Sequence, residues 1–246
     1  MTGDVSLLDN AVWHALTTRH ASVAEGEGRA RRYPPDVSVF GAVDAFDAAS
    51  WVDLADVASH VGHVTLFRDA IPPAPPGWAV TLEGVGHQMV LEALVATPVP
   101  PVRRLAAGDV PRMLDLVART RPGPFEARTI ELGSYFGVFD GDELVAMAGE
   151  RLRLPGFTEI SAVCTDPSAR GRGLAAGLSA HVATAILARG DTPFLHHARE
   201  NDGARRVYER LGFVFRRRVV FRTLHPPAQG APNAPPAPPA VSEPDE

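Results

Sequence analysis

Apolar residues recur every four positions along one stretch in the carboxy-terminal half of the chain. The repeated positions are Leu174, Leu178, Val182 and Ile186. Side chains at this spacing lie on one face of an α-helix. The pattern therefore predicts a helix over residues 171–189 that packs its apolar face on a sheet.

Shorter apolar segments alternate with helical ones between residues 100 and 224, in an order that favours an α/β sheet with crossover connections. Strands are predicted over residues 102–105, 135–139, 144–153, 158–165 and 194–197, with one strand or a pair over 213–224. Further helices are predicted over residues 109–119, after Pro124 and over residues 201–211. The segment Asp140-Gly141-Asp142 is typical of a hairpin turn, so the strands on either side of it are expected to be antiparallel.

The first part of the chain has a weaker pattern. It predicts a helix over residues 44–60, strands over 63–68 and 78–82, and a rigid proline-rich connector at 71–76. We predict a separate, smaller α/β lobe over residues 1–99, with a boundary at residues 99–101. Residues 225–246 are rich in proline and alanine, which indicates a disordered tail, with a polyproline ligand as the alternative.

Composition narrows the class of protein. A hydrophobic content of 45% supports packed cores, and a formal net charge of −5 argues against a general binder of nucleic acid or anionic membranes. All 24 basic residues are arginine, so phosphate contacts must come from guanidinium groups and backbone amides. The single cysteine, Cys164, is consistent with a reducing compartment. We expect a cytoplasmic protein, because the chain begins without a leader pattern and has no apolar run long enough to span a bilayer.

A glycine-containing loop, residues 165–175, lies between a predicted strand and the helix predicted over residues 171–189. Gly171 and Gly173 have no Cβ, so backbone N–H groups can close on a phosphate where the helix dipole is positive. The loop lacks the Lys-Ser/Thr ending of a P-loop and the three-glycine spacing of a dinucleotide fingerprint. A nucleoside triphosphate or NAD is therefore disfavoured.

Two motifs resemble signatures of the GNAT superfamily of acyl-CoA-dependent N-acyltransferases. Arg170-x-x-Gly173-x-Ala175 resembles its pyrophosphate-binding signature. Residues 201–213, NDGARRVYERLGF, are similar to its second signature, Asn-x-x-Ala-x-x-x-Tyr-Glu-x-x-Gly-Phe. Both occur in the expected order, and the resemblance covers residues 100–224. It implies a mixed, mostly antiparallel sheet flanked by helices, and residues 86–91 look like a strand from a degenerate copy of the same fold.

The resemblance also implies a set of cofactor-binding residues. Coenzyme A would lie between the strands predicted over 158–165 and 194–197, with its pantetheine arm on one strand edge and its pyrophosphate on the glycine loop. Asn201 would cap the following helix and touch the pantetheine arm. The expected residues are Val163, Cys164, Thr165, Arg170, Gly171, Arg172, Gly173, Leu174, Ala175 and Asn201.

Tyr208 is the candidate general acid, because many GNAT enzymes have a tyrosine at this point of the second motif. The alternative is an ordinary buried residue on an apolar helix face. Glu159 is the candidate base, acting through water; a regular strand would place it on the same face as Ser161, Val163 and Thr165. An exposed strand carboxylate is its alternative, and Glu131 and Glu150 are reserves.

Three further residues are weighed for catalysis. His196 and His197 lie on a predicted strand beside the cleft, where either could act as a base, although structural histidines are commoner. Cys164 is not expected to form an acyl-enzyme, because no activating His/Asp set accompanies it.

The expected function is transfer of an acetyl group from acetyl-CoA to a primary amine by direct attack in a ternary complex. The alternatives are an inactive coenzyme A-binding sensor or scaffold and an acyltransferase with a longer acyl donor. The acceptor, a small-molecule or peptide amine, is not indicated by any motif. We expect no nucleic-acid or membrane partner, and either a monomer or a homodimer.

Overall fold

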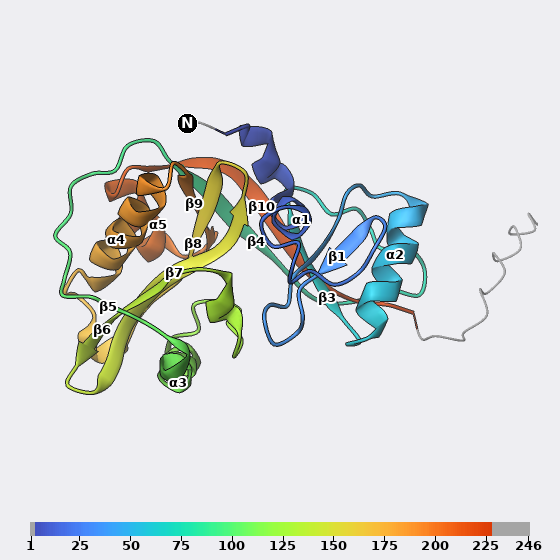
Figure 1. The fold of residues 1–246 in the computed structure, drawn as a ribbon. Helices are drawn as coiled ribbons and strands as arrows, with labels where there is room; N and C mark the ends of the chain where they lie inside the picture. Colours follow the sequence, from blue (N-terminus) through green and yellow to red (C-terminus); the bar gives the residue numbers. More distant parts are fainter. Residues whose placement is uncertain (1–2, 228–246) are drawn as a thin grey trace, which may run out of the picture.

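A computed structural model of the protein describes residues 3–227, and most of the predicted tail, residues 225–246, lies outside this range. One sheet of eight strands forms its centre (Figure 1). From edge to edge the strands are β3 (Val64–Arg68), β10 (Phe213–His225), β4 (Ala79–Leu91), β9 (Thr192–Ala198), β8 (Phe157–Thr165), β7 (Glu143–Leu154), β6 (Tyr135–Asp140) and β5 (Arg103–Arg104).

All neighbouring strands are antiparallel except β8 and β9. This parallel pair is joined only where Phe157–Ile160 lies beside Thr192–Leu195. Beyond Ile160 the two strands separate, which leaves backbone groups of β8 unpaired on that side. The expectation of a mixed, mostly antiparallel sheet is confirmed, including the hairpin between β6 and β7.

Helices cover both faces of the sheet. On one face lie α4 (Leu174–Ala188) and α5 (Asp202–Arg210), whose apolar residues share a core with β7, β8, β9 and β4. The stripe predicted for α4 is confirmed, because each of its members is at most 5% exposed: Leu174, Leu178, Val182 and Ile186. On the other face lie α3 (Val110–Thr120) and α1 (Ala11–Thr17), each with its own apolar cluster against the sheet.

The amino-terminal part joins the same sheet. It contains a small two-stranded sheet, β1 (Ala30–Arg32) with β2 (Gly41–Val43), and the helix α2 (Ala48–Ser59). Its other two strands, β3 and β4, pair with β10, and β4 also pairs with β9. Figure 1 shows the long strands β4 and β10 running from one half of the molecule to the other. The main sheet therefore crosses the boundary predicted at residues 99–101.

Two predicted strands of the first part, 78–82 and 86–91, are halves of the single strand β4. The glycine between them, Gly84, looks like a break in the sequence, but it has a packing role. A Cβ at Gly84 would lie 2.1 Å from Cζ of Phe221, so the ring of that residue rests on the bare backbone of β4. Residues 86–91 thus belong to the main sheet, where they pair with β10 and β9.

Some other elements differ from their predictions. The helix expected after Pro124 is only a turn of 3₁₀ helix, Thr129–Leu132. The helix expected from residue 171 begins at Leu174, because Gly171 and Gly173 have left-handed φ angles of 78° and 75°. Three elements, α1, β1 and β2, were not predicted, because they are too short to give a clear period.

Candidate active site

A bulge shapes β8 at the point where it leaves β9. Ala162 has a φ of 53°, and the register with β7 shifts between Met147 and Gly149. A bulge inserts one residue and reverses the alternation of side chains beyond it. Ile160 and Val163 accordingly pack on the α4 side, whereas Cys164 packs with the α3 cluster.

The expectation that Glu159 shares a face with Val163 and Thr165 is therefore wrong. That expectation assumed a regular strand, and the bulge at Ala162 breaks the alternation between residues 159 and 163.

The loop before α4 exposes backbone donors. Gly173 occupies the N-cap position of this helix of 15 residues but supplies no side-chain cap, and the first intrahelical bond to it comes from the Gly177 N–H. The N–H groups of Leu174, Ala175 and Ala176 precede this bond and have no partner within the helix. All three residues line a cavity of about 1190 Å³, together with Gly171 and Gly173. We call these five residues the helix end of the cavity.

Two arginines of the predicted set differ in position. Arg170 lines the cavity, and its Nε donates to the Thr165 carbonyl oxygen at 3.4 Å. Arg172 is exposed and lies 3.7 Å from a carboxylate oxygen of Asp140, and it is not among the lining residues. Only the first of the two side chains is thus placed to meet a ligand in the cavity.

Asp166 stabilises this loop, although it was not predicted as a site residue. Its carboxylate accepts from the backbone N–H of Ser168 at 3.0 Å, from the Ser168 hydroxyl at 2.7 Å and from Arg119 Nε at 2.8 Å. The hydrogen bonds from Ser168, with the charge of Arg119, hold the pKa of Asp166 below its usual value. The Asp-Pro-Ser run is typical of a turn that begins with a capping aspartate, a signal present in the sequence.

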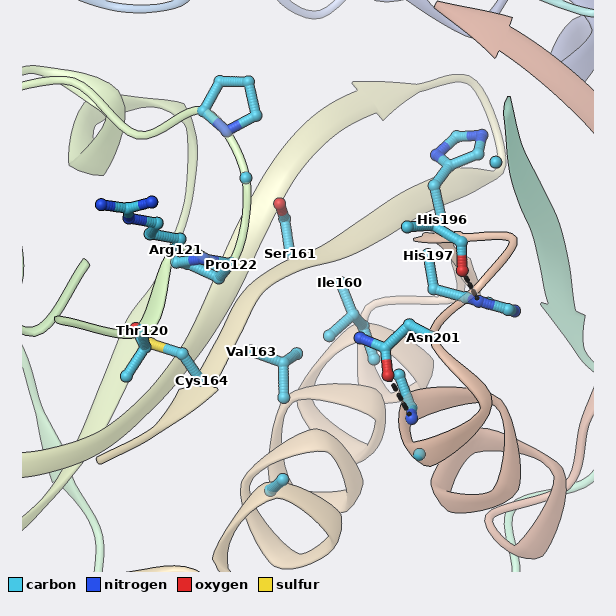
Figure 2. Close-up of a pocket in the computed structure, with 18 of the residues that line it drawn as sticks. Thr120, Arg121, Pro122, Ile160, Ser161, Val163, Cys164, His196, His197 and Asn201 are labelled. Atoms are coloured by element: carbon cyan, nitrogen blue, oxygen red, sulfur yellow. Dashed lines mark hydrogen bonds between the residues drawn. The ribbon is translucent and has the colours of Figure 1, made fainter. Parts of the chain in front are cut away.

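Asn201, the N-cap of α5, and Tyr208, within α5, also line the cavity. The Asn201 side-chain oxygen accepts from the Ala204 N–H at 2.9 Å, so its capping role is confirmed (Figure 2). The Tyr208 ring packs near His197 and Phe213, and within residues 3–227 its hydroxyl has no hydrogen-bond partner. Burial raises the pKa of Tyr208, so the phenol carries its proton at neutral pH.

Cys164 is buried on the cavity wall, beside Thr120 at the end of α3 (Figure 2). Burial raises the pKa of its thiol to about 11. A nucleophilic cysteine requires the thiolate form, which a thiol this weakly acidic does not supply near neutral pH. The geometry agrees with the expectation that Cys164 is not an acylation site.

Glu159 is fully buried and is not among the residues that line the cavity. Its carboxylate accepts from Arg151 Nε and Nη2 at 2.9 and 2.7 Å, and His196 Nδ1 lies 2.7 Å away. Burial alone would raise the pKa of Glu159, but the charge of Arg151 and the bonds from His196 and Arg151 lower it to about 2. Its two partners, rather than the carboxylate itself, reach the cavity wall.

The two neighbouring histidines lie on opposite faces of β9. His196 Nε2 lies 3.0 Å from the amide nitrogen of Gln88, so we assign its proton to Nδ1, which donates to Glu159. Both of its nitrogens are engaged, as in a structural histidine. His197 Nδ1 donates to the Ala198 carbonyl at 2.8 Å, and in the described part of the chain its buried Nε2 has no partner.

The two reserve carboxylates lie away from the cavity lining. Glu131 forms an ion pair with Arg128, and Glu150 forms one with Arg189 at 2.7 Å. The geometry favours neither of them as the base.

Comparisons with known proteins place this geometry in a family. Residues 135–221 match the family model described as FR47-like protein, and no curated protein matches the chain. A solved structure from Novosphingobium aromaticivorans, assigned to the GNAT family of acetyltransferases, is 34% identical with a TM-score of 0.80. The match covers 89% of this chain and 98% of that one. The chain belongs to the GNAT family of acetyltransferases.

A second solved structure, a GCN5-related N-acetyltransferase from Kribbella flavida, shares the fold at 17% identity and a TM-score of 0.62. That match covers 93% of this chain and 97% of that one. Both matches extend beyond residues 100–224, so the amino-terminal strands belong to the shared fold. None of the helices between residues 3 and 227 is long and apolar enough to cross a membrane.

In this GNAT acetyltransferase the cavity continues past the separation of β8 and β9 toward the amino-terminal part. Its walls there are mainly apolar, and we call this region the aromatic end. It consists of Val39, Phe40, His63, Thr65, Phe67, Leu82, Phe221 and Thr223. These residues were not predicted, because no local motif marks them. They meet through the pairing of β3, β4 and β10 and through a bridge between Phe40 and Thr65.

Proposed function

We propose that the protein transfers an acetyl group from acetyl-CoA to a primary amine by direct attack in a ternary complex. The observation that carries the proposal is a single cavity. It joins the unpaired N–H groups at the head of α4 to the Tyr208 hydroxyl and then to the aromatic end. A donor and an acceptor can therefore occupy one cavity from opposite ends, as direct transfer requires.

The residues at the helix end suit a pyrophosphate. Free N–H groups and the positive end of the α4 dipole stabilise an anion. A Cβ at Gly171 or Gly173 would meet no protein atom within 4 Å, so it is the left-handed backbone that requires glycine there. We propose that Arg170 adds positive charge beside the phosphates.

The unpaired edge of β8 suits the pantetheine arm. Val163, Cys164 and Thr165 lie beyond the last pair of β8 with β9, and all three line the cavity. An extended, amide-containing arm can bond to such an edge as an added strand does. We propose that a backbone N–H of this edge also polarises the thioester carbonyl.

The chemistry needs a proton for the leaving thiolate. The amine nitrogen forms a bond to the acetyl carbon and loses a proton, the carbon–sulfur bond breaks, and the sulfur takes a proton. Tyr208 is our candidate donor, because its hydroxyl is protonated and has no partner within the described residues. A phenol and an alkyl thiol have similar ordinary pKa values, but burial makes Tyr208 a weaker acid than a free phenol.

The reaction also needs a base that deprotonates the ammonium group of the acceptor. Glu159 is the sequence-based prediction, acting through water, but a carboxylate with a pKa of about 2 that lies behind Arg151 and His196 is a weak base. Its geometry supports a positioning role, in which it fixes Arg151 and the tautomer of His196. These two roles predict different pH profiles for a Glu159 variant.

Two measurements on the purified full-length protein test the proposal. Calorimetry with acetyl-CoA measures donor binding, and a thiol-release assay on a panel of primary amines measures transfer. We expect saturable binding and thiol release that depends on the amine, with intersecting initial-velocity lines. Binding without release for any amine would instead support the sensor or scaffold, and faster release from a longer acyl-CoA would support the longer donor.

A further inference from the structure

The aromatic end of the cavity brings together three phenylalanines from distant parts of the chain. Phe40 precedes β2, Phe67 lies on β3 and Phe221 lies on β10. The rings of Phe40 and Phe67 are stacked with centroids 5.6 Å apart, and the Phe67 and Phe221 centroids are 6.4 Å apart. Such spacings are those at which aromatic rings attract one another.

The sheet itself provides a flat floor for this cluster. The Phe221 ring lies on Gly84, where any Cβ would collide with it. On the neighbouring strand, the ring of His196 meets that of Phe67 edge-on, with centroids 4.4 Å apart. Figure 2 shows His196 on β9, on the side of the cavity away from Cys164. Three phenyl rings and the His196 ring thus form much of this wall. The wall also contains His63 and the hydroxyls of Thr65 and Thr223, which bond to each other at 2.8 Å.

The charge on the cavity wall is one-sided. Within residues 3–227, the residues that line the cavity include four arginines, Arg121, Arg151, Arg170 and Arg210, but no aspartate or glutamate. Arg151 is neutralised by Glu159 behind it. A ligand with several ammonium groups would therefore lose its hydration at this wall without gaining a carboxylate partner.

We propose, on the basis of the acetyl transfer proposed above, that the acceptor is a primary amine that carries an aromatic ring. Its ring packs against Phe67 and Phe221, and its reacting amine is its only cationic group. The ring fills the aromatic end while the amine points along the cavity toward Tyr208. Acceptor choice then depends on the amino-terminal part of the chain, and donor binding depends on the helix end.

Three amines of known chemistry test the acceptor class at saturating acetyl-CoA. Phenethylamine has the ring, 2-cyclohexylethylamine has its size without aromaticity, and spermidine has several cationic groups. We expect kcat/KM for phenethylamine to exceed that for the cyclohexyl analogue by about 5-fold and that for spermidine by about 100-fold. Equal or better use of spermidine would overturn the proposal while leaving acetyl transfer intact.

Substitutions at Phe67 and Phe221 test whether these two residues determine acceptor preference. Phe67→Ala and Phe221→Ala are expected to lower kcat/KM for phenethylamine by about 10-fold and to leave the acetyl-CoA dissociation constant unchanged. Phe67→Leu keeps apolar volume, so it should remove the preference for phenyl over cyclohexyl even if the alanine variant folds poorly. Phe215→Ala is the matched control, because this phenylalanine also lies on β10 but is 58% exposed and away from the cavity lining.

The alternative occupant of the aromatic end is the acyl group of a longer donor. In that case Phe67→Ala would change the preference between hexanoyl-CoA and acetyl-CoA and leave the ranking of the three amines unchanged, which would overturn the proposal. If acetyl-CoA does not bind, or releases no thiol with any amine, the proposed function fails together with this inference.

Discussion

The helix end and the aromatic end line the same cavity, but they are built from different parts of the chain and in different ways. The helix end is made of backbone N–H groups within a few consecutive residues, held by two left-handed glycines and by Asp166. The aromatic end is made of side chains from four distant segments: residues 39–40, residues 63–67, β4 and β10. The helix end depends on the conformation of a few consecutive residues, whereas the aromatic end depends on the fold that brings separate side chains together. We therefore expect single substitutions to disrupt donor binding more easily than acceptor binding.

The largest effect is expected at the helix end. Gly173→Val places a β-branched residue at a φ of 75°, which disfavours the loop conformation and withdraws the N–H groups of α4 from the ligand. We expect acetyl-CoA affinity to fall about 100-fold or more, as measured by calorimetry.

The matched control for this variant is Gly141→Val, at the hairpin between β6 and β7. Gly141 also has a left-handed φ, 59°, and is not among the cavity-lining residues. Both variants should lose about 1–2 kcal/mol of stability, but only the first should lose the donor. Equal affinities in the two variants would refute the backbone site.

Tyr208→Phe is expected to lower kcat about 100-fold, because the leaving thiolate loses its proton donor. The dissociation constant of acetyl-CoA should hardly change. Tyr135→Phe is the control: that hydroxyl is buried without a partner in the described structure, and the residue is not among those that line the cavity. Full turnover in Tyr208→Phe would remove this residue from the mechanism.

Glu159→Gln tests positioning against base catalysis. The carboxylate pKa of about 2 lies below its ordinary value of 4.5, so the ion pair stabilises the fold above about pH 4.5. That stabilisation is lost as the pH falls through about 2. This stabilisation corresponds to about 3 kcal/mol. At neutral pH the Glu159→Gln variant should lose about this much free energy of unfolding, and its stability should no longer depend on pH between 4.5 and 2.

The pH profile of kcat then separates the two roles of Glu159. In a positioning role the variant keeps the shape of the profile at temperatures where it is folded. A change in that shape, at unchanged secondary structure, would instead support the predicted water-mediated base.

Cys164→Ala should have the smallest effect on turnover, within about 3-fold of the unchanged protein, because a thiol with a pKa of about 11 is not the nucleophile. Some loss of stability is expected from the lost side-chain volume. Accumulation of an acetylated protein in mass spectra of the wild type, absent in this variant, would contradict direct attack.

The features that could be predicted from the sequence are local, whereas those that depend on strand pairing could not be predicted. The apolar stripe of α4, the glycine loop and the Asn201 cap are local features, and each is present as expected. The bulge at Ala162 and the ion pair of Glu159 with Arg151 were not foreseen, because each depends on pairing between strands. The aromatic end could not be predicted for the same reason, since β3 and β4 join the sheet through contacts distant in sequence.

Hydrogen–deuterium exchange of the wild-type protein, with and without saturating acetyl-CoA, tests the two-ended cavity most directly. The account predicts that acetyl-CoA slows exchange at the amides of Gly171–Ala176 and leaves those of β3 unchanged, and that phenethylamine added afterwards slows exchange around Phe67. Unchanged exchange at the head of α4 on addition of acetyl-CoA would contradict it.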